Sequence, residues 1–250
     1  MPIISVLLAT NKIDEYLWLA IDSILEQKDI DFELIVIANG LECDQVFSDI
    51  SARLASTERV ILLKTPVPQL AYALNLGLSS ANTDIIARMD ADDIALPTRL
   101  VSQYSYMTKN GLDLVGTDIF VIDSQGLYKG KKEYPRGDMI NKLLPFRNCF
   151  CHPSVMCKKK MLYDVRGYNS GFNSEDYDLW LRAMRLGVKW DNMSEPLLQY
   201  RVHLSSAQGT RLAYAECLAL SVREFFLKKS LSRFLAMCCH AVKFLYKKMR

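Results

Sequence analysis

The stretch Asp84-Ile-Ile-Ala-Arg-Met-Asp-Ala-Asp-Asp-Ile-Ala-Leu-Pro-Thr-Arg-Leu100 decides the fold. Its apolar run, residues 85–89, predicts a short buried strand. Pro97 indicates the first turn of a helix, where the missing N–H costs nothing. Three carboxylates lie between strand and helix: Asp90, Asp92 and Asp93. Because open α/β sheets bind ligands at the carboxyl ends of their strands, this acidic turn is a candidate ligand site.

The acidic turn favours a divalent-cation site. Side chains alternate along an extended backbone, so Asp90 and Asp92 are expected to point to one side and Asp93 to the other. Two carboxylates on one side suit Mg²⁺ or Mn²⁺, whose other positions are commonly filled by water and substrate phosphates. The alternative is a plain acidic turn in which Asp93 caps the helix that starts at Pro97. The D-x-D triplet alone does not decide between them, because such triplets are common.

The chain before this stretch alternates between strands and helices. Apolar runs predict buried strands over residues 3–9, 32–38 and 60–63. Apolar residues at helical spacing predict a helix over residues 13–27, and further helices are expected over residues 44–55, which are mostly polar, and 70–80. Such alternation is typical of a mostly parallel central sheet flanked by helices. The predicted fold class is therefore α/β.

After the acidic turn, predicted strands and helices no longer alternate regularly. Helices are expected over residues 100–107, 159–165 and 175–186, and extended segments over 112–122, 127–134 and 152–156. The first half is therefore expected to bind a nucleotide, and the second half to receive another substrate.

Length and composition suit one α/β domain, or a domain with a small appendage. The chain has 250 residues, 50% of them hydrophobic, and a net charge of +3. So small a charge gives no signature of nucleic-acid binding. The positive charge is concentrated in residues 223–250, which carry eight Lys or Arg and one acid, a net of +7, and leave −4 for residues 1–222.

Cysteine usage and the N-terminus predict a reducing, cytoplasmic setting. Seven cysteines, an odd number, do not suit a disulfide framework. Cys149-Phe-Cys151-His152 lacks a second ligand pair, so zinc is not expected there. The first residues contain no basic region or cleavage site of a signal peptide. No run of 18 or more apolar residues occurs, so no membrane span is predicted.

Several short motifs follow one another in a specific order and spacing between residue 4 and about residue 206. They are Ser5-Val-Leu-Leu-Ala-Thr-Asn11, Ser23-Ile-Leu-Glu-Gln27, Glu33-Leu-Ile-Val-Ile37, Ala73-Leu-Asn-Leu-Gly-Leu78, Ala87-Arg-Met-Asp-Ala-Asp-Asp93, Cys151-His-Pro-Ser-Val-Met156, Gly167-Tyr168, Glu175-Asp-Tyr-Asp-Leu-Trp-Leu-Arg182 and Tyr200-Arg-Val-His203. Together they resemble the family 2 glycosyltransferases, which have the GT-A (nucleotide-diphospho-sugar transferase) fold. The resemblance is strongest to bacterial enzymes that build O-antigens and capsular polysaccharides.

This resemblance implies an inverting, metal-dependent glycosyltransferase. Such an enzyme moves a sugar from a nucleotide-sugar donor to a hydroxyl of a growing lipid-linked glycan, in O-antigen, lipopolysaccharide or capsule biosynthesis. We therefore expect a GT-A domain over residues 1–222, with a nucleotide-sugar-binding half (1–93) and an acceptor-side half (94–222). Residues 223–250 are expected to form a basic amphipathic C-terminal helical extension.

The resemblance also suggests which residues hold the metal and the donor phosphates. Asp92, with Asp90 beside it, is expected to hold Mn²⁺ or Mg²⁺, and Asp90 also to touch the donor ribose. Some enzymes of the family take a metal ligand from a late histidine, in the region that His203 occupies; an acceptor contact or a structural role is the alternative. Arg88 is expected either to pair with a donor phosphate or to form a salt bridge with Asp90 or Asp92.

The nucleotide base is expected at the carboxyl ends of the first two strands, near Thr10, Asn11 and Asn39. Many relatives have two acids before the glycine, whereas this chain has Ala38-Asn39-Gly40. An amide can still donate to or accept from a base edge, but the usual contact to uracil is open. UDP-sugars are therefore only slightly favoured over GDP- or dTDP-sugars.

The pair Glu175-Asp176 matches an acidic pair of the family, whose aspartate usually acts as general base. Asp176, beside Glu175, is therefore expected to take the proton of the acceptor hydroxyl. The alternative is that both carboxylates only favour the N-terminus of a helix through its dipole. His152 is expected on the acceptor side.

Residues 231–250 carry apolar side chains at helical spacing and basic side chains on the other side. A basic amphipathic helix is typical of a membrane-surface element, and a helix packed on its own domain is the alternative. Because the resembling enzymes use acceptors anchored to lipid, we predict peripheral contact with anionic lipid at the inner face of the cytoplasmic membrane.

Two other function classes stay open. A sugar nucleotidyltransferase would be expected to carry a Gly-rich basic loop after the first strand, and residues 10–14 contain no glycine. A non-catalytic sugar-nucleotide-binding or assembly subunit at the membrane fits the loss of acids before Gly40. Retention of Asp90, Asp92 and Asp176 argues against that second class.

Overall fold

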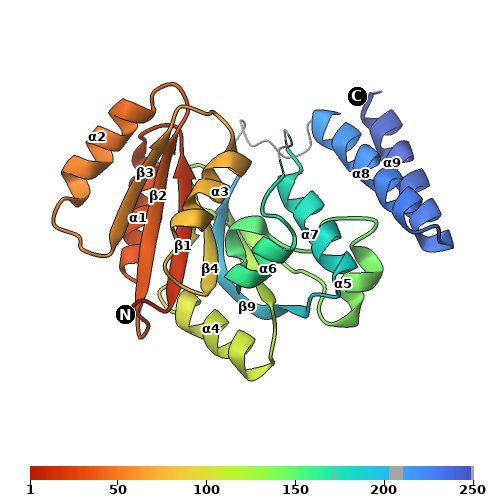
Figure 1. The fold of residues 1–250 in the computed structure, drawn as a ribbon, viewed down its shortest axis with the longest axis horizontal. Coiled ribbons are helices and arrows are strands. Elements are labelled where there is room, and N and C mark those ends of the chain that lie inside the picture. Colours follow the sequence, from red (N-terminus) through yellow and green to blue (C-terminus); the bar gives the residue numbers. More distant parts are fainter. Residues whose placement is uncertain (170, 172, 203–210, 249–250) are drawn as a thin grey trace.

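The computed structural model describes residues 1–169, 171, 173–202 and 211–248. Within these residues a nine-stranded sheet has the order β3-β2-β1-β4-β8-β6-β9-β5, with β7 paired to β6 outside this path. Figure 1 shows the sheet between layers of helices, with the C-terminal helices α8 and α9 at the far end from α2.

The first half is a parallel sheet with helical crossovers, as the sequence predicts. Its strands are β1 (Ile4–Thr10), β2 (Phe32–Asn39), β3 (Val60–Thr65) and β4 (Ile85–Asp90), and its helices are α1 (Glu15–Leu25), α2 (Cys43–Leu54) and α3 (Leu70–Ser80). The apolar side chains of α1 and α2 pack on one face of β1 and β2, and those of α3 pack on the other. Coverage on both faces explains why these strands are continuous apolar runs rather than alternating ones.

The second half continues the same sheet with short antiparallel strands and one long parallel pair. Its elements are β5 (Ile94–Ala95), α4 (Arg99–Lys109), β6 (Leu114–Ile122), β7 (Tyr128–Lys132), α5 (Asp138–Leu143), the 3-10 turn His152–Ser154, β8 (Met156–Lys158), α6 (Lys159–Asp164), α7 (Glu175–Arg185) and β9 (Trp190–Arg201). Strand β8 runs antiparallel to β4 and to β6, so β6 and β9 point in the direction of β1. The prediction of a mostly parallel central sheet is confirmed.

Three local expectations are not met: the start of the helix after the acidic turn, the alternative role of Asp93 as its cap, and the extended segment 152–156. The helix after this turn begins at Arg99 rather than at Pro97, because residues 94 and 95 first pair with β9 as an edge strand. Asp93 does not cap that helix; its Oδ1 accepts a hydrogen bond from the backbone N–H of Arg201, at 2.8 Å. The predicted extended segment 152–156 begins instead with the 3-10 turn, which the bond from the N–H of Val155 to the carbonyl of His152 closes.

The C-terminal helices α8 (Arg211–Leu227) and α9 (Leu231–Lys248) form an antiparallel hairpin against α7 and the loop after α5 (Figure 1). Position 223, where the predicted extension begins, lies within α8. An ionic network joins α7 to α8, in which Asp178 pairs with Arg182 and Arg223 while Arg185 pairs with the buried Glu224. None of the described helices is long and apolar enough to cross a membrane.

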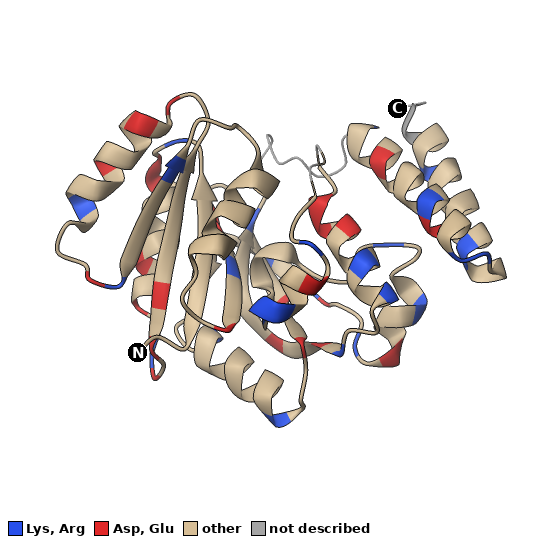
Figure 2. Cartoon of the chain, viewed as in Figure 1, with Lys and Arg blue, Asp and Glu red and all other residues tan. Residues whose placement is uncertain are grey.

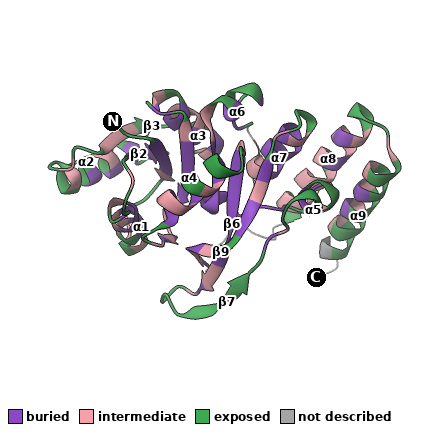
Figure 3. Ribbon diagram, turned by 90° about the horizontal axis from the view of Figure 1, so that it is seen from below, coloured by how far each residue is buried: buried purple, intermediate pink, exposed green. Residues whose placement is uncertain are grey.

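Helix α9 does not pack on the domain through its row of apolar side chains, as an amphipathic helix usually would; the opposite face makes the contact. Ala236 and His240 are buried, and Lys243 donates to the backbone carbonyl of Phe146 at 2.8 Å. The apolar stripe is exposed instead, as the green side of α9 in Figure 3 shows; its members are Leu231, Phe234, Leu235, Val242, Leu245 and Tyr246. We call these six residues the apolar stripe of α9.

Candidate active site

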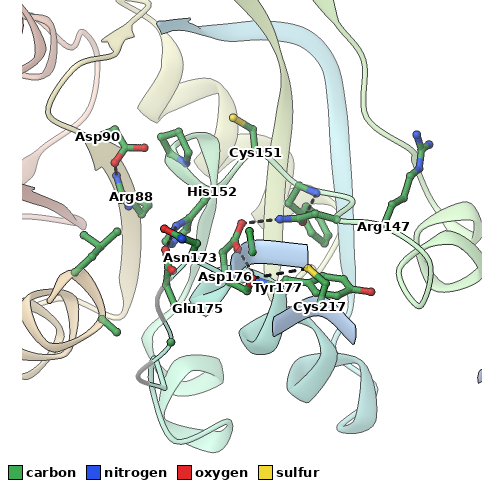
Figure 4. A pocket seen from close by; sticks show the side chains of 18 of the residues that line it. Arg88, Asp90, Arg147, Cys151, His152, Asn173, Glu175, Asp176, Tyr177 and Cys217 are labelled. Atoms are coloured by element: carbon green, nitrogen blue, oxygen red, sulfur yellow. Dashed lines mark hydrogen bonds and ion pairs between the residues drawn. The ribbon is translucent and has the colours of Figure 1, made fainter. Parts of the chain in front are cut away.

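A cavity of about 1060 Å³ opens between the end of β4, the N-terminus of α7 and the C-terminal hairpin. Six residues that the sequence analysis singled out line it: Arg88, Asp90, Asp92, His152, Glu175 and Asp176. Figure 4 shows Arg88 and Asp90 on one side of the cavity, with His152 and the first turn of α7 facing them. The two acidic motifs, 86 positions apart between Asp90 and Asp176, therefore meet in one site.

The acidic turn brings three carboxylates together. One oxygen each of Asp90, Asp92 and Asp93 lies within 4.8 Å of the others. The expectation that Asp93 points to the opposite side is wrong, because the chain turns at Ala91 and Asp92 and strand alternation ends there. Burial and the two neighbouring carboxylates hold the pKa of Asp93 well above its usual range.

This cluster fits a divalent cation. Asp93 is fully buried, and its Oδ2 has no hydrogen-bond partner in the part of the chain that the structure describes. A buried carboxylate oxygen without a donor is costly unless a cation compensates it. An all-oxygen donor set of this kind suits Mg²⁺ or Mn²⁺ rather than zinc.

Arg88 is buried and lines the cavity beside this cluster. Its guanidinium forms an ion pair with Asp90, so of the two expectations for Arg88 the salt bridge is present. The Nε atom of Arg88 is buried and has no hydrogen-bond partner among the described residues. The pKa of Asp90 is nevertheless raised, because burial outweighs the favourable charge of Arg88.

Helix α7 presents Glu175 and Asp176 from its first turn, which is the red end of α7 in Figure 2. Both oxygens of Asp176 accept hydrogen bonds: Oδ2 from the side-chain amide of Asn148 and Oδ1 from the backbone N–H of Tyr177, each at 2.6 Å. Burial raises the pKa of Asp176, and these two hydrogen bonds oppose that rise. Burial, with the charge of Asp176, raises the pKa of Glu175 to about 7.

His152 lies between Glu175 and Tyr168. Its Nδ1 is 3.9 Å from Oε1 of Glu175, and its Nε2 is 3.3 Å from the hydroxyl of Tyr168. Burial and the nearby charge of Arg88 hold the pKa of His152 well below its usual value, so the ring is neutral. Tyr168 is fixed in turn by Asn75 of α3, whose side-chain amide bonds to both its backbone N–H and its backbone carbonyl, at 2.9 and 2.8 Å.

The residues expected to hold the nucleotide base do not line this cavity. Thr10, Asn11 and Asn39 lie at the carboxyl ends of β1 and β2, on the same sheet edge as Asp90, which pairs in register with Ala9. The hydroxyl of Thr10 donates to the carbonyl of Lys12 at 2.7 Å, and Asn11 is exposed. His203 lies outside the described residues, so its expected metal contact stays a prediction.

The cavity wall also contains residues that sequence reasoning missed. Asn148 comes from the loop after α5, and the hairpin supplies Tyr214, Cys217, His240 and Lys243. Asn148 lies in an irregular loop, where periodicity carries no signal. The sequence analysis placed His240 only in the C-terminal tail and assigned no role to Cys217, because the position of the hairpin depends on contacts far apart in the sequence.

Comparison with known proteins gives one family. The sequence model of the family described as Glycosyl transferase family 2 matches residues 5–172. The chain is 45% identical over 249 residues to the Escherichia coli "O-antigen biosynthesis glycosyltransferase WbnJ", covering 99% of this chain and 98% of that protein. It is 31% identical over 235 residues to the Escherichia coli "UDP-Gal:alpha-D-GlcNAc-diphosphoundecaprenol beta-1,3-galactosyltransferase", covering 86% of this chain and 81% of that protein.

Among solved structures, the fold is similar to that of TarS from S. aureus. The structure of TarS residues 1–349 in complex with UDP-GlcNAc superposes with a TM-score of 0.69 at 15% sequence identity, and the match covers 98% of this chain and 81% of TarS 1–349. A second structure of the same TarS fragment contains UDP and has a TM-score of 0.70, at 94% coverage of this chain and 69% of that one.

Proposed function

The chain belongs to glycosyl transferase family 2, and from that premise we propose that it transfers a sugar, with inversion, from a nucleotide-sugar donor to a hydroxyl of a lipid-linked saccharide. It is a glycosyltransferase with the GT-A fold. One observation supports the proposed reaction: the acidic turn after β4 and Asp176 on α7 line the same cavity. The acidic turn would hold the cation that offsets the charge of the leaving phosphates, and Asp176 would take the proton of the incoming hydroxyl.

In the proposed reaction, the acceptor hydroxyl oxygen forms a bond to the anomeric carbon of the donor sugar while the bond from that carbon to the phosphate oxygen breaks. The nucleoside diphosphate leaves with the electron pair, and Asp176 takes the hydroxyl proton. Asp176 must be ionised for this role. Its hydrogen bonds from Asn148 and from the N–H of Tyr177 favour the ionised form and fix the direction of both oxygens.

Asp92 and Asp90, together with Asp93, would hold Mn²⁺ or Mg²⁺. Such an ion, when bound, offsets the negative charge that develops on the departing diphosphate. Asp93 is an addition to the predicted ligand set. Its buried Oδ2, which has no hydrogen-bond partner among the residues that the structure describes, supports this role more directly than any motif does.

We propose a uridine diphosphate sugar as the donor. Two TarS structures that share this fold contain UDP-GlcNAc and UDP, respectively, and one relative carries UDP-Gal in its name. Thr10, Asn11 and Asn39 lie on the sheet edge beside Asp90, which is where the base of such a donor would be held.

The acceptor proposed is a saccharide on a lipid diphosphate, for O-antigen or a related polysaccharide. The names of two relatives support it, one through O-antigen biosynthesis and one through a diphosphoundecaprenol acceptor. The exposed apolar stripe of α9 supports contact with the membrane that would carry such an acceptor, at the cytoplasmic face.

A screen of nucleotide sugars tests this function. Purified protein is incubated with UDP-, GDP- and dTDP-sugars, with Mn²⁺ or with EDTA, and release of the nucleoside diphosphate is measured. We expect release from a UDP-sugar with Mn²⁺ and little release with EDTA. Release of pyrophosphate from a nucleoside triphosphate and a sugar phosphate would support a nucleotidyltransferase instead, and no turnover of any donor would support a binding subunit.

A further inference from the structure

The loop after α5 makes a contact with Asp176 that no motif predicts. The side-chain amide of Asn148 donates to Oδ2 of Asp176 at 2.6 Å, and the amide oxygen of Asn148 accepts from the backbone N–H of Phe150 at 3.2 Å. The second bond holds the amide in one orientation, with its NH₂ group toward Asp176. Asn148 and Asp176 both line the cavity.

Helix α9 holds the same loop from the other side. Nε2 of His240 lies 3.1 Å from the carbonyl of Pro145 and 3.2 Å from the hydroxyl of Tyr177, and Lys243 donates to the carbonyl of Phe146 at 2.8 Å. The hydroxyl of Tyr177 in turn lies 2.8 Å from the carbonyl of Leu144. Two side chains of α9 and one of α7 therefore fix the backbone of residues 144–146, which ends two positions before Asn148.

We propose that Asn148 is a positioning residue for the base Asp176, and that α9 holds in place the loop that presents it. This proposal rests on the proposed function, in which Asp176 takes the acceptor proton. The amide of Asn148 touches Asp176 rather than any reacting atom, so it acts through that carboxylate. It keeps Oδ2 turned into the cavity and favours the ionised carboxylate.

Other titratable or charged groups around Asp176 also influence whether its carboxylate is ionised. The titratable or charged groups that face Asp176 from the packed elements are Arg88, Tyr134, Tyr168, Glu175, Tyr177 and Cys217. Arg88 favours the ionised form of Asp176 and an ionised Glu175 opposes it. Asn148 is the side chain that donates a hydrogen bond to this carboxylate among the described residues.

The test compares Asn148→Ala with Asn141→Ala, an exposed asparagine of α5 outside the cavity. Turnover of UDP-galactose or UDP-GlcNAc is followed from pH 5 to 9 with Mn²⁺ and a short-chain alkyl diphosphate of GlcNAc as acceptor. For Asn148→Ala we expect the acid limb of the pH profile to move upward by about one pH unit, so that kcat falls about tenfold at the acid end of the range and less at higher pH, and the donor KM to change little. Asn148→Gln, which keeps the amide, should recover part of the loss, and Asn141→Ala should match the wild type.

The support from α9 is tested in the same assay with His240→Ala against Cys239→Ala, an exposed neighbour on the same helix that lies outside the apolar stripe. The first variant should move the acid limb in the same direction as Asn148→Ala, by less, and the second should leave it in place. A loss of activity in Asn148→Ala that is equal at every pH, or no loss at all, would overturn the positioning role.

A readout without turnover separates this proposal from the proposed function. Carbon-13 NMR titration of aspartate carboxyl groups, with the Asp176 signal assigned by its absence in Asp176→Asn, reports the protonation of that one group. The Asp176 signal should titrate at higher pH in Asn148→Ala than in the wild type. If wild-type protein turns over no donor, the proposed function fails, while an unchanged titration of Asp176 would refute the role of Asn148 by itself.

Discussion

Three carboxylate groups at the end of β4 lie within 4.8 Å of one another and repel one another unless a cation lies among them. Changing Asp92 to Ala removes an expected ligand at a strand end and outside the core, so the fold should survive. We expect calorimetric binding of Mn²⁺ to weaken and turnover to fall by about 10²-fold or more. Asp49→Ala, an exposed carboxylate on α2, is the matched control. Full turnover of Asp92→Ala in EDTA would rule out the cation site.

The role of Asp176 is separable from donor binding. Asp176→Asn has nearly the same shape but cannot take the acceptor proton, so turnover should fall by about 10²–10⁴-fold. Binding of a UDP-sugar, measured by calorimetry, should be close to that of the wild type. Donor binding that disappears together with activity would place Asp176 in the nucleotide site instead.

Glu175 should make stability depend on pH. Its folded-state pKa of about 7 is above the unfolded value of 4.5, because burial and Asp176 penalise the charged form. The folded state therefore holds a proton that the unfolded state has lost between these values, and stability falls as pH rises from about 4.5 to about 7. Glu175→Gln removes this dependence, so its thermal midpoint should exceed that of the wild type at pH 8 and match it near pH 4.5. An equal difference at both pH values would contradict this account.

Single residues show where sequence reasoning succeeds and where it ends. Asp90, Asp92 and Asp176 could be placed because each follows or opens an element with a clear apolar pattern, and the cavity contains all three. The direction of Asp93 could not be predicted, since it depends on an N–H of Arg201, 108 positions away. Asn148 was missed for the same reason, because its partner belongs to another element.

The elements of the first half follow from local pattern, and those of the second half do not. Strands β1 to β4 are continuous apolar runs between helical segments, and each was predicted within a few residues. Strand β9 was not predicted because its buried and exposed positions do not alternate regularly. It also contains Pro196, and its pairing with β6 shifts register near Thr117 and Asp118. Helix α8 was missed because its apolar residues are spread around the whole helix.

The C-terminal hairpin has one face on the domain and one in solvent, which determines how its proposed contact with the membrane can be tested. Truncation after residue 229 would remove His240 and Lys243 from the cavity wall along with the apolar stripe, so it cannot separate the two roles. Leu235→Glu and Val242→Glu change exposed positions only. Each buried side chain of this kind contributes about 1.5–3 kcal/mol, so binding to vesicles of phosphatidylglycerol and phosphatidylethanolamine should weaken by about tenfold or more.

The control for this prediction lies on the same helix. Ser232→Glu adds the same charge at an exposed polar position of α9. It should reduce vesicle binding only slightly and mainly at low salt, because it adds charge without removing apolar area. Equal vesicle binding by the wild type and Leu235→Glu would remove the membrane role of the stripe.

At the scale of the whole molecule, one continuous sheet joins the two halves of the chain. The elements of the first half could be predicted from the sequence better than those of the second. The parallel half ends in the acidic turn, and the antiparallel β8 brings the 3-10 turn with His152 against β4. Asn75 of α3 then ties Tyr168, next to His152, to the first half. The division into donor and acceptor halves stays a prediction, but these contacts explain how motifs from both halves meet in one cavity.

The anomeric configuration of the transferred sugar tests the proposed chemistry as a whole. Wild-type protein is given a UDP-sugar, Mn²⁺ and a short-chain diphosphate-linked acceptor, and the proton coupling at the new glycosidic carbon is read by NMR. A single displacement assisted by Asp176 predicts the configuration opposite to that of the donor. A product with the configuration of the donor would require a second displacement and a nucleophile other than this base, and would contradict the account.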